Sequence, residues 1–462
     1  MRNKFKDLDW KFYRRLFVLT LPIVIQNLIA SMLNMADTLM IGKLGEKELA
    51  AVGMANQYFF FFSLMLFGVN AGVSMFISQF WGKKDILSIK KMTSIGIVLG
   101  TTISIIFMVI GIIFPNQIIG IFNKDAQVVA LGGRYLVVVA LSYVFTAISF
   151  SFAFASRSIE NSFLPMMASI VALLINIVGN YILIFGKFGV EAMGVEGAAW
   201  ATVFARIIET IIIITYVYYK KMPIKVNLSN LLHIDTKFLN MSMKGITPIL
   251  VNEIVWGLGN VTYNIIYSRL GVSAAATIQI TTTVLNLLMI VIFALGSSAM
   301  IIVGQEIGRG DIARGRTYAK KLYKLALKVG IFVGIIVYFV APYVVLFFNM
   351  SSAVLKSSEI ILKINSIALM FRTYNFIMIV GILRGGGDAK FGLILQGITM
   401  WFIGIPLVYL AAFIFKLPIY YVVLFCTVEE IVKLIFVSIR FNSGKWIKDI
   451  TGSSKDRESQ LA

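Results

Sequence analysis

The sequence has little of what most enzymes and soluble domains need. Its 462 residues include one cysteine, Cys426, and one histidine, His233. A single cysteine excludes an internal disulfide and a cysteine-rich metal site, and a single histidine removes most metalloenzyme and proton-shuttle designs. Only 14% of the residues are charged, against about 25% in soluble domains. We therefore expect no enzyme, no resident cofactor and no structural metal.

Apolar residues dominate the sequence instead. They make up 59% of the chain, and apolar runs of roughly 20 residues, enough to cross a bilayer, recur throughout. The runs lack the alternation of membrane β-strands, which favours helices over a closed barrel. We predict an all-α polytopic membrane protein with twelve transmembrane helices. The predicted spans are residues 16–41, 51–80, 94–114, 130–155, 163–185, 198–219, 246–267, 277–306, 325–347, 361–383, 391–415 and 419–439.

The net charge of +20 is distributed unevenly between the loops. With twelve spans, about 29 Lys and Arg residues fall on the side of the two termini and about 9 on the other side. Two of the dense basic clusters are Arg2 to Arg15 and Arg309 to Lys324. The positive-inside rule then predicts a multi-pass protein of the cell membrane with both termini in the cytoplasm. Because the charge orients the protein in membrane lipid, we expect no nucleic-acid partner.

The longest polar segment between spans divides the chain into two sets of six helices. We predict an N-terminal lobe over residues 1–219, a cytoplasmic linker over 220–245, a C-terminal lobe over 246–440 and a cytoplasmic tail over 441–462. The tail ends in SSKDRESQLA, a polar composition typical of disorder. Two six-helix lobes need no second chain to form a cleft, so we expect a monomer.

The two halves match each other without a gap at an offset of 226 residues. The matching proline, glycine and polar residues are Pro22 with Pro248, Asn34 with Asn260, Gly45 with Gly271, Gln79 with Gln305, Gly82 with Gly308, and Asp85 with Asp311. Arg157 and Arg384 match at an offset of 227. Because six helices separate the copies, both run the same way through the membrane, as in transporters with parallel repeats. With no GxxxxGK[ST] motif for ATP, the pattern indicates a secondary transporter.

Several motifs carry a family resemblance over nearly the whole length. They include LPIVIQNLIASMLNMADTLMIGKLG and RSIENSFLP in the first half, and NEIVWGLGNVTYNIIYSRLG and GILRGGGDAKF in the second. With these motifs the sequence resembles the multidrug and toxic compound extrusion (MATE) transporters. The resemblance implies a cation-coupled antiporter, driven by H⁺ or Na⁺, that exports amphiphilic and often cationic organic compounds. The same superfamily contains lipid-linked oligosaccharide flippases, which remain the alternative.

Polar residues on three predicted helices fall at a similar depth in the outer part of the bilayer. Asp37 lies roughly 33 Å along the first helix and Asn180 roughly 26 Å along the fifth, while Thr202 lies near the outer start of the sixth. Asn34 and Asn176 precede the first two by one turn. Oxygen ligands of this kind suit a hard cation, and a carboxylate in an apolar setting can also hold a proton. The alternative is that Asp37 ends its helix at the interface and the amides tie helices together.

The resemblance assigns a role to these positions. In MATE transporters the aspartate that matches Asp37 is implicated in cation coupling, together with positions that match Asn176, Asn180 and Thr202. Many relatives carry aspartate where this chain has Asn180. One carboxylate instead of two would hold Na⁺ less strongly, which favours a protonatable Asp37 without deciding between the two ions.

The second half differs chemically from the first. Tyr263 takes the position of Asp37, and the candidate site residues are instead Glu253, Arg384 and Asp388. Some relatives use a glutamate in this helix for coupling, although by spacing from Pro248 it falls nearer Trp256 than Glu253. The alternative for the other two residues is an Arg384–Asp388 ion pair at a helix end.

The remaining charges inside spans have structural explanations, because charges that pair locally cost less to bury. The expected pairs are Arg206 with Glu209, Glu429 with Lys433, and Arg372 with Glu429 or Glu430. A flippase should carry several unpaired cations at mid-depth to bind a pyrophosphate, and these pairs leave few. This disfavours the flippase alternative, and small organic molecules, which the resemblance implies, are the expected substrates.

Overall fold

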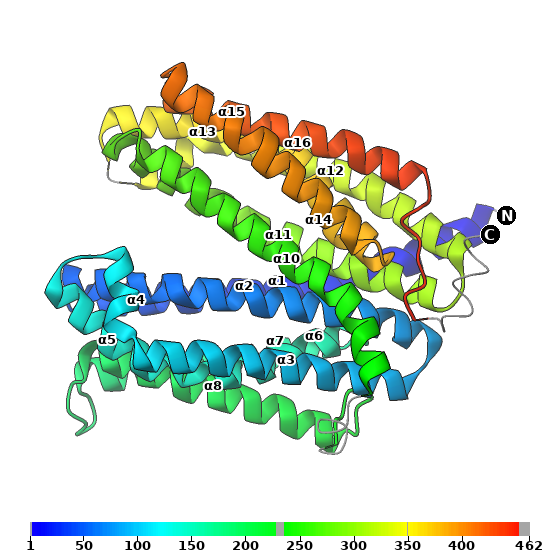
Figure 1. The fold of residues 1–462 in the computed structure, drawn as a ribbon, viewed down its shortest axis with the longest axis horizontal. Helices are drawn as coiled ribbons and strands as arrows, with labels where there is room; N and C mark the ends of the chain where they lie inside the picture. The colour runs from blue at the N-terminus through cyan, green and yellow to red at the C-terminus, as the bar shows by residue number, and fades with distance from the viewer. Residues whose placement is uncertain (1, 228–234, 349, 452–462) are drawn as a thin grey trace. The chain divides into compact units, whose positions relative to one another are not determined.

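The computed structural model describes residues 2–227, 235–348 and 350–451. All regular secondary structure in those ranges is helical (Figure 1). The single histidine, His233, and the polar end of the predicted tail, residues 452–462, lie outside the described residues.

Nine helices in the described part of the chain are long and apolar enough to cross a membrane. A tenth span is the pair α5 (Ala126–Ala140) and α6 (Ser142–Ser158), which is bent by 47°. The other two predicted spans correspond to α10 (Thr236–Ser268) and α16 (Ile419–Asn442). With 33 and 24 residues they measure about 50 and 36 Å, so length is sufficient. They are less apolar because they carry polar and charged side chains.

The described chain packs as two compact units. The first unit, residues 21–77 and 85–246, lies in the blue-to-green part of Figure 1. Its helices are α1 (Arg2–Gly42) from Leu21, α2 (Glu46–Lys83) to Ile77, α3 (Ile86–Ile113), α4 (Pro115–Phe122), α5, α6, α7 (Phe163–Phe185), α8 (Gly194–Tyr219) and the start of α10. One of its apolar clusters includes Phe62 and Tyr143, whose rings stack with centroids 4.4 Å apart.

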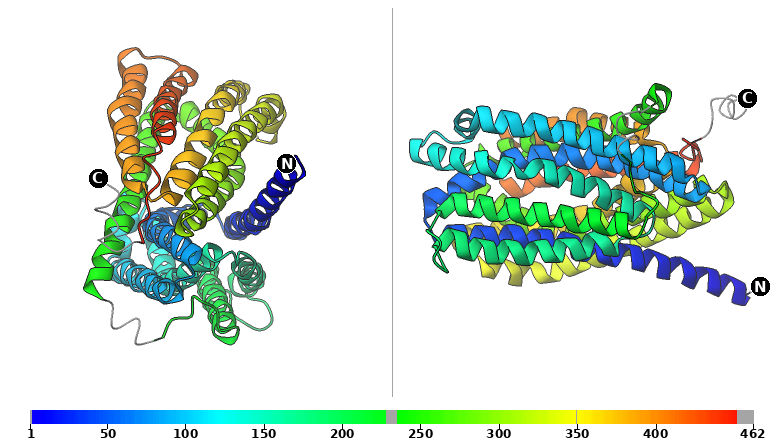
Figure 2. Two further views of the ribbon diagram at one scale, coloured as in Figure 1. Left: turned by 90° about the vertical axis from the view of Figure 1, so that its right-hand side faces the viewer. Right: turned by 90° about the horizontal axis from the view of Figure 1, so that it is seen from below.

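The second unit comprises residues 1–20, 78–84 and 247–462, as far as they are described. Viewed nearly end-on, its later helices group into a bundle (Figure 2, left). They are α10 from Thr247, α11 (Val272–Gly308), α12 (Ile312–Val344), η1 (Val345–Phe347), α13 (Ser352–Phe376), η2 (Ile377–Leu383), α14 (Ala389–Ile398), η3 (Thr399–Gly404), α15 (Ile405–Tyr409), η4 (Leu410–Ile414) and α16. Three of these segments, η2, η3 and η4, are π-helical.

Residues 2–20 and 78–84 belong to the second unit, although the linker-based division places them in the N-terminal lobe. A close helix crossing explains the second segment. A Cβ on Gly82 would overlap the backbone of Gln305, and one on Gly308 would overlap the backbone of Gln79. Only glycine allows two backbones to approach so closely. The repeat-related Gly82 and Gly308 therefore hold the end of α2 against the end of α11.

The repeat also fixes where two helices begin. The Asp85 carboxylate accepts a hydrogen bond from the Ser88 amide at 3.0 Å, and Asp311 accepts one from the Arg314 amide at 2.9 Å. Such side-chain caps satisfy a backbone donor at a helix N-terminus that has no partner within the helix. The same cap therefore starts α3 in one half and α12 in the other.

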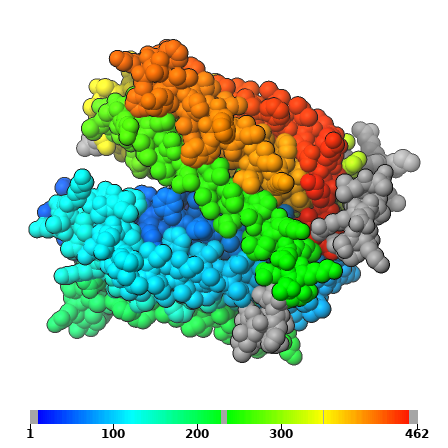
Figure 3. All heavy atoms as spheres, viewed as in Figure 1, coloured from blue at the N-terminus to red at the C-terminus, as the bar shows by residue number. Residues whose placement is uncertain are grey.

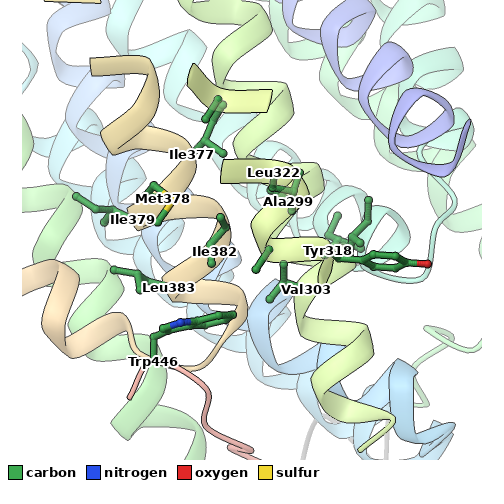
Figure 4. Close-up of a cluster of buried hydrophobic side chains, with 14 of the residues drawn as sticks. Ala299, Val303, Tyr318, Leu322, Ile377, Met378, Ile379, Ile382, Leu383 and Trp446 are labelled. Carbon is green, nitrogen blue, oxygen red and sulfur yellow. The ribbon is translucent and has the colours of Figure 1, made fainter. Parts of the chain in front are cut away.

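The expected disorder after about residue 441 is wrong for residues 443–451. This segment, which we call the C-terminal strap, runs down the right side of Figure 1 in dark red. Trp446 is only 1% exposed and lies beside Leu383 in an apolar cluster (Figure 4). Its indole donates a hydrogen bond to the Phe441 carbonyl at 3.0 Å. One large aromatic side chain thus anchors a segment whose polar composition resembles a free tail.

The strap is also held by its backbone. The amide of Lys448 donates to the carbonyl of Gly386 at 2.7 Å, and the amide of Ile450 donates to the side chain of Gln79 at 3.0 Å. Gly386 has no room for a side chain beside Trp446. In the space-filling view the red chain end lies at the right-hand side of the orange and red helices (Figure 3).

Candidate functional site

Three helices of the first unit bring the predicted ion ligands together. The side-chain amide of Asn180 on α7 donates to the Asp37 carboxylate on α1 at 2.5 Å. The same amide donates to the side-chain oxygen of Asn176 at 3.1 Å. The Asn176 amide in turn approaches the Thr202 hydroxyl on α8 at 3.3 Å. We call Asp37, Asn176, Asn180 and Thr202 the Asp37 cluster. It forms a continuous hydrogen-bonded line across α1, α7 and α8.

The Asp37 cluster leaves one buried acceptor oxygen without a donor among the described residues. Asn176 and Asn180 are fully buried, and the side-chain carbonyl oxygen of Asn180 has no hydrogen-bond partner within the described residues. Asp37 forms no ion pair in that part of the chain; its carboxylate accepts a hydrogen bond from the side-chain amide of Asn180. A buried acceptor without a donor is costly, and here it lies beside an unpaired carboxylate. The arrangement suits a small cation or a proton.

Asn34, the fifth predicted member, lies apart from this line. Its side chain is exposed, and its backbone carbonyl accepts a hydrogen bond from the Thr38 hydroxyl at 2.7 Å. The hydrogen bonds that join the Asp37 cluster do not include it. One helical turn separates Asn34 from Asp37, but the two side chains face different surroundings.

A second polar chain runs through the same unit. The Arg157 guanidinium on α6 donates to the Gln26 carbonyl on α1, and the Gln26 amide contacts the Ser169 hydroxyl at 3.1 Å. Ser169 donates to Glu209 at 2.8 Å, and Glu209 pairs with Arg206 at 2.7 Å. Arg206 also interacts electrostatically with Asp37. The two networks therefore interact electrostatically through Arg206 and Asp37.

The sequence analysis did not identify two members of this second hydrogen-bonded network, Gln26 and Ser169. Both are polar residues inside predicted spans, and that was the available signal. It does not indicate which helix each residue faces. Tyr135 on α5, which is 4% exposed, also interacts electrostatically with Asp37. A tyrosine in an apolar helix gave no indication of which element it would face.

The second unit carries a polar cluster around Tyr263, the repeat partner of Asp37. The Tyr263 hydroxyl donates to Glu429 on α16 at 2.5 Å, and Lys433 forms an ion pair with the same carboxylate. Next to it, Glu430 lies 3.7 Å from both Lys433 and Arg372. The Asn375 amide donates to Glu430 at 2.8 Å. We call Tyr263, Arg372, Glu429, Glu430 and Lys433 the Tyr263 cluster.

The other second-half candidates form two separate ion pairs. Arg384, 3% exposed, lies 2.6 Å from Glu253. Asp388 accepts from Arg440 at 2.7 Å and from Lys448 of the C-terminal strap at 2.6 Å.

The alternative Arg384–Asp388 pair is therefore wrong. Spacing of four residues predicts contact only within a continuous helix. Here the helix ends at Gly385–Gly387, and Gly387 has a φ of +84°, so Asp388 turns away from Arg384.

Within residues 2–227, 235–348 and 350–451, no group of three or more His, Cys, Asp or Glu side chains is placed to hold a metal ion. The Asp37 cluster combines a single carboxylate with amide and hydroxyl oxygens.

A family model described as MatE matches the chain twice, over residues 22–182 and 248–410. The two matches begin 226 residues apart (248 − 22), which is the offset of the internal repeat. The predicted duplication is thereby confirmed.

Curated relatives match along nearly the whole chain. The uncharacterized transporter YisQ of Bacillus subtilis is 26% identical over 441 residues, covering 94% of this chain and 95% of the relative. A probable multidrug resistance protein NorM of Thermotoga maritima is 24% identical and covers 94% and 93%.

Solved structures share the fold. A MATE transporter in the bent conformation aligns with a TM-score of 0.84 at 17% identity, covering 94% of this chain and 96% of that one. The Vibrio cholerae MATE transporter VcmN, in a mutant form, aligns with a TM-score of 0.86 at 17% identity, covering 95% and 98%. The predicted all-α membrane fold, twelve helices in two lobes of six, is confirmed.

Proposed function

The chain belongs to the MatE family of membrane transporters, and on this premise we propose that it is an antiporter in which inward flow of H⁺ or Na⁺ drives export of amphiphilic, often cationic, organic compounds. Relatives that match over most of their length include several described as probable multidrug resistance proteins. The membrane potential supplies about 2.3 kcal/mol per charge per 100 mV, before any ion gradient is added. We propose cytoplasmic termini, so that ions enter from the opposite side.

One observation carries the coupling role of the Asp37 cluster. An unpaired carboxylate lies beside a fully buried amide whose carbonyl oxygen has no donor among the described residues. A Na⁺ ion would gain the Asp37 carboxylate and the Asn180 carbonyl as ligands at once. A proton would instead neutralise Asp37 and make it a donor. Either ion supplies positive charge where the protein leaves acceptors unsatisfied.

Ion binding would change the hydrogen bonds between helices. The Asn180 side-chain amide donates to both Asp37 and Asn176. An ion on Asp37 would compete for the carboxylate and weaken its hold on α7. This gives the coupling ion a differential interaction with two arrangements of α1 and α7, which any population shift requires.

Charge pairing favours organic cargo over a lipid-linked pyrophosphate. Four cations in the spans already have a carboxylate partner. These are Arg206, Arg372, Arg384 and Lys433. A pyrophosphate-binding flippase would need several cations free to contact the phosphates, and Arg157, whose hydrogen bond goes to the amide of Gln26, is one such cation.

The decisive experiment uses Asp37→Asn in proteoliposomes loaded with a fluorescent organic cation. We expect the wild type to export the dye under a pH gradient or a Na⁺ gradient imposed separately, and Asp37→Asn to lose gradient-driven efflux by at least tenfold. Thr38→Ala, an exposed neighbour on α1, is the matched control and should transport normally. Full efflux by Asp37→Asn at equal reconstitution would refute the coupling role. If the wild type moves no dye but scrambles a lipid-linked oligosaccharide, the antiporter proposal is wrong.

A further inference from the structure

The second unit contains a counterpart of the Asp37 cluster that is already charge-balanced. Position 263 corresponds to position 37 by the repeat (37 + 226), and each side chain makes a short hydrogen bond to a later helix of its own unit. Asp37 supplies a carboxylate and meets an amide. Tyr263 supplies a hydroxyl and meets the carboxylate of Glu429. In the first unit the carboxylate is therefore on α1, whereas in the second unit it is on the later helix, α16.

The Glu429 carboxylate differs from that of Asp37 in having a fixed cation. Lys433, one turn later on α16, forms an ion pair with Glu429 and lies 3.7 Å from Glu430. The side chains of Lys433 and Glu429 are only 6% and 3% exposed. The ammonium therefore sits among carboxylate oxygens in a site closed to solvent, which is the position that an alkali cation would take at a carboxylate.

All charged groups facing Glu429 balance one another. Arg372 on α13 pairs with Glu430, so that Lys433 is left to compensate Glu429. From α10, the uncharged hydroxyls of Tyr263 and Tyr267 face the group, and Cys426 of α16 lies near them. The neighbouring backbone is equally close, because a side chain at Gly404 would overlap both the Tyr263 hydroxyl and the Glu429 carboxylate.

We propose that Lys433 is a tethered cation: its ammonium permanently occupies, in the second unit, the kind of site that a transported H⁺ or Na⁺ occupies reversibly at Asp37 in the first. This inference rests on the proposed function of Asp37. It adds that the duplicated protein exchanges one ion per cycle rather than two. It also predicts that the second unit has a latent ion site, with Glu429, Glu430 and the Tyr263 hydroxyl as ligands.

The test asks whether removal of the tethered ammonium creates an ion site. Binding of radioactive ²²Na⁺ and uptake of protons between pH 9 and pH 5 are measured on purified protein in micelles. Asp37→Asn alone should lose one bound ion or proton relative to the wild type. Asp37→Asn/Lys433→Met should regain one, and adding Glu429→Gln should remove it again. Lys328→Met, which deletes an exposed lysine of α12, is the matched control and should restore nothing.

Folding of the variant is itself informative. Lys433→Met leaves Glu429 buried without its cation, so its melting temperature should rise with added Na⁺ or with falling pH, whereas that of Lys328→Met should not. Lys433→Gln, which keeps a polar group, should behave in the same way. A folded Lys433→Met variant that gains neither ion nor proton, or variants that neither Na⁺ nor acid can stabilise, would overturn the proposal.

The two proposals fail differently. If Asp37→Asn binds as many ions as the wild type, the coupling role of Asp37 is wrong, while the gain on removal of Lys433 still reports on the second unit. If Asp37→Asn abolishes binding and Lys433→Met restores none, only the tethered cation is wrong.

Discussion

The two units place polar groups at related positions but satisfy charge in different ways. In the first unit the buried Arg157 donates to an amide, Gln26; in the second its repeat partner Arg384 donates to a carboxylate, Glu253, at 2.6 Å. Gln26 and Glu253 lie four and five residues after the repeat-related prolines of their helices. The contact is thus conserved between the halves, and the charge of the partner is not.

A second pair of positions repeats the contrast. Asn161 follows Arg157 by four residues, as Asp388 follows Arg384. The Asn161 side chain accepts from the Leu164 amide at 3.3 Å and carries no charge. Asp388 instead holds Arg440 and Lys448. At both positions, an amide in the first unit corresponds to a paired carboxylate in the second.

The difference in charge pairing suggests different roles for the two units. Charges that pair with opposite charges are neutral together, so they need no ion from solution. Asp37 and Arg157, whose hydrogen bonds go to amides, remain sensitive to the arrival of another charge, because an amide carries no charge of its own. We infer that the first unit responds to ions and that the second is an electrostatically fixed scaffold.

The largest effect should come from breaking a second-unit pair. Glu253→Leu leaves Arg384 buried without a partner, which costs about 3–5 kcal/mol of unfolding free energy. Gln26→Leu removes only a neutral partner from Arg157 and should cost about 1–3 kcal/mol. Unfolding by SDS in mixed micelles measures both. Equal costs would mean that the charge of the partner is irrelevant and would break the comparison.

Glu253→Gln serves as the control for this experiment. It reproduces in the second unit the arginine–amide contact that the first unit already uses, without opening a cavity. Its cost should fall well below that of Glu253→Leu. If Glu253→Gln costs as much unfolding free energy as Glu253→Leu, a hydrogen-bond acceptor alone is not sufficient for Arg384, and a carboxylate is required at position 253.

The fold was accessible from the sequence because its signals are repeated. The spacing of apolar runs predicts the spans, and the prolines and glycines of the repeat predict the duplication that the two family matches confirm. Partners within one helix, such as Arg206 with Glu209, follow from spacing alone. Partners on different helices do not, because nothing in the sequence states which faces meet. Gln26 and Ser169 were missed for this reason.

Two further misreadings have physical causes. The strap resembles a disordered tail in composition, yet the buried side chain of Trp446, together with backbone hydrogen bonds and ion pairs, docks it. The Arg384–Asp388 prediction required a continuous helix, whereas three glycines separate the two residues and the helix ends among them. Local spacing is reliable only where the helix is regular.

A smaller effect is expected from making the first unit resemble the second. Gln26→Glu converts the guanidinium–amide hydrogen bond of Arg157 into an ion pair, and the Coulomb energy gained is opposed by the cost of burying the new carboxylate. The change also removes the amide that contacts Ser169 at 3.1 Å. The unfolding free energy should therefore change by less than about 1 kcal/mol. A loss of several kcal/mol of unfolding free energy would show that glutamine is needed at position 26 because it contacts both Arg157 and Ser169, and not because it is uncharged.

The smallest effect should come from a second-unit pair that is not buried. Lys83 and Asp449 lie 2.8 Å apart and are 32% and 33% exposed. Partial burial opposes ionisation of Asp449, but hydrogen bonds from Lys83 and Thr451 outweigh it and lower the pKa of Asp449. Exposed pairs contribute about 0–1 kcal/mol. Asp449→Asn should therefore loosen the strap only slightly, as measured by hydrogen exchange of residues 444–451.

The sign of the pH dependence follows from the lowered pKa of Asp449. Its contribution is complete above the ordinary aspartate pKa of about 3.9 and is lost as the pH falls through the lower value of the folded state. Wild type and Asp449→Asn should thus differ by a constant amount between pH 5 and pH 8, estimated at about 0–1 kcal/mol, and converge in stronger acid. A difference that disappears near neutral pH would mean that another group holds the strap. A difference as large as that of Glu253→Leu would mean that the ion pairs of the second unit are strong whether or not they are buried.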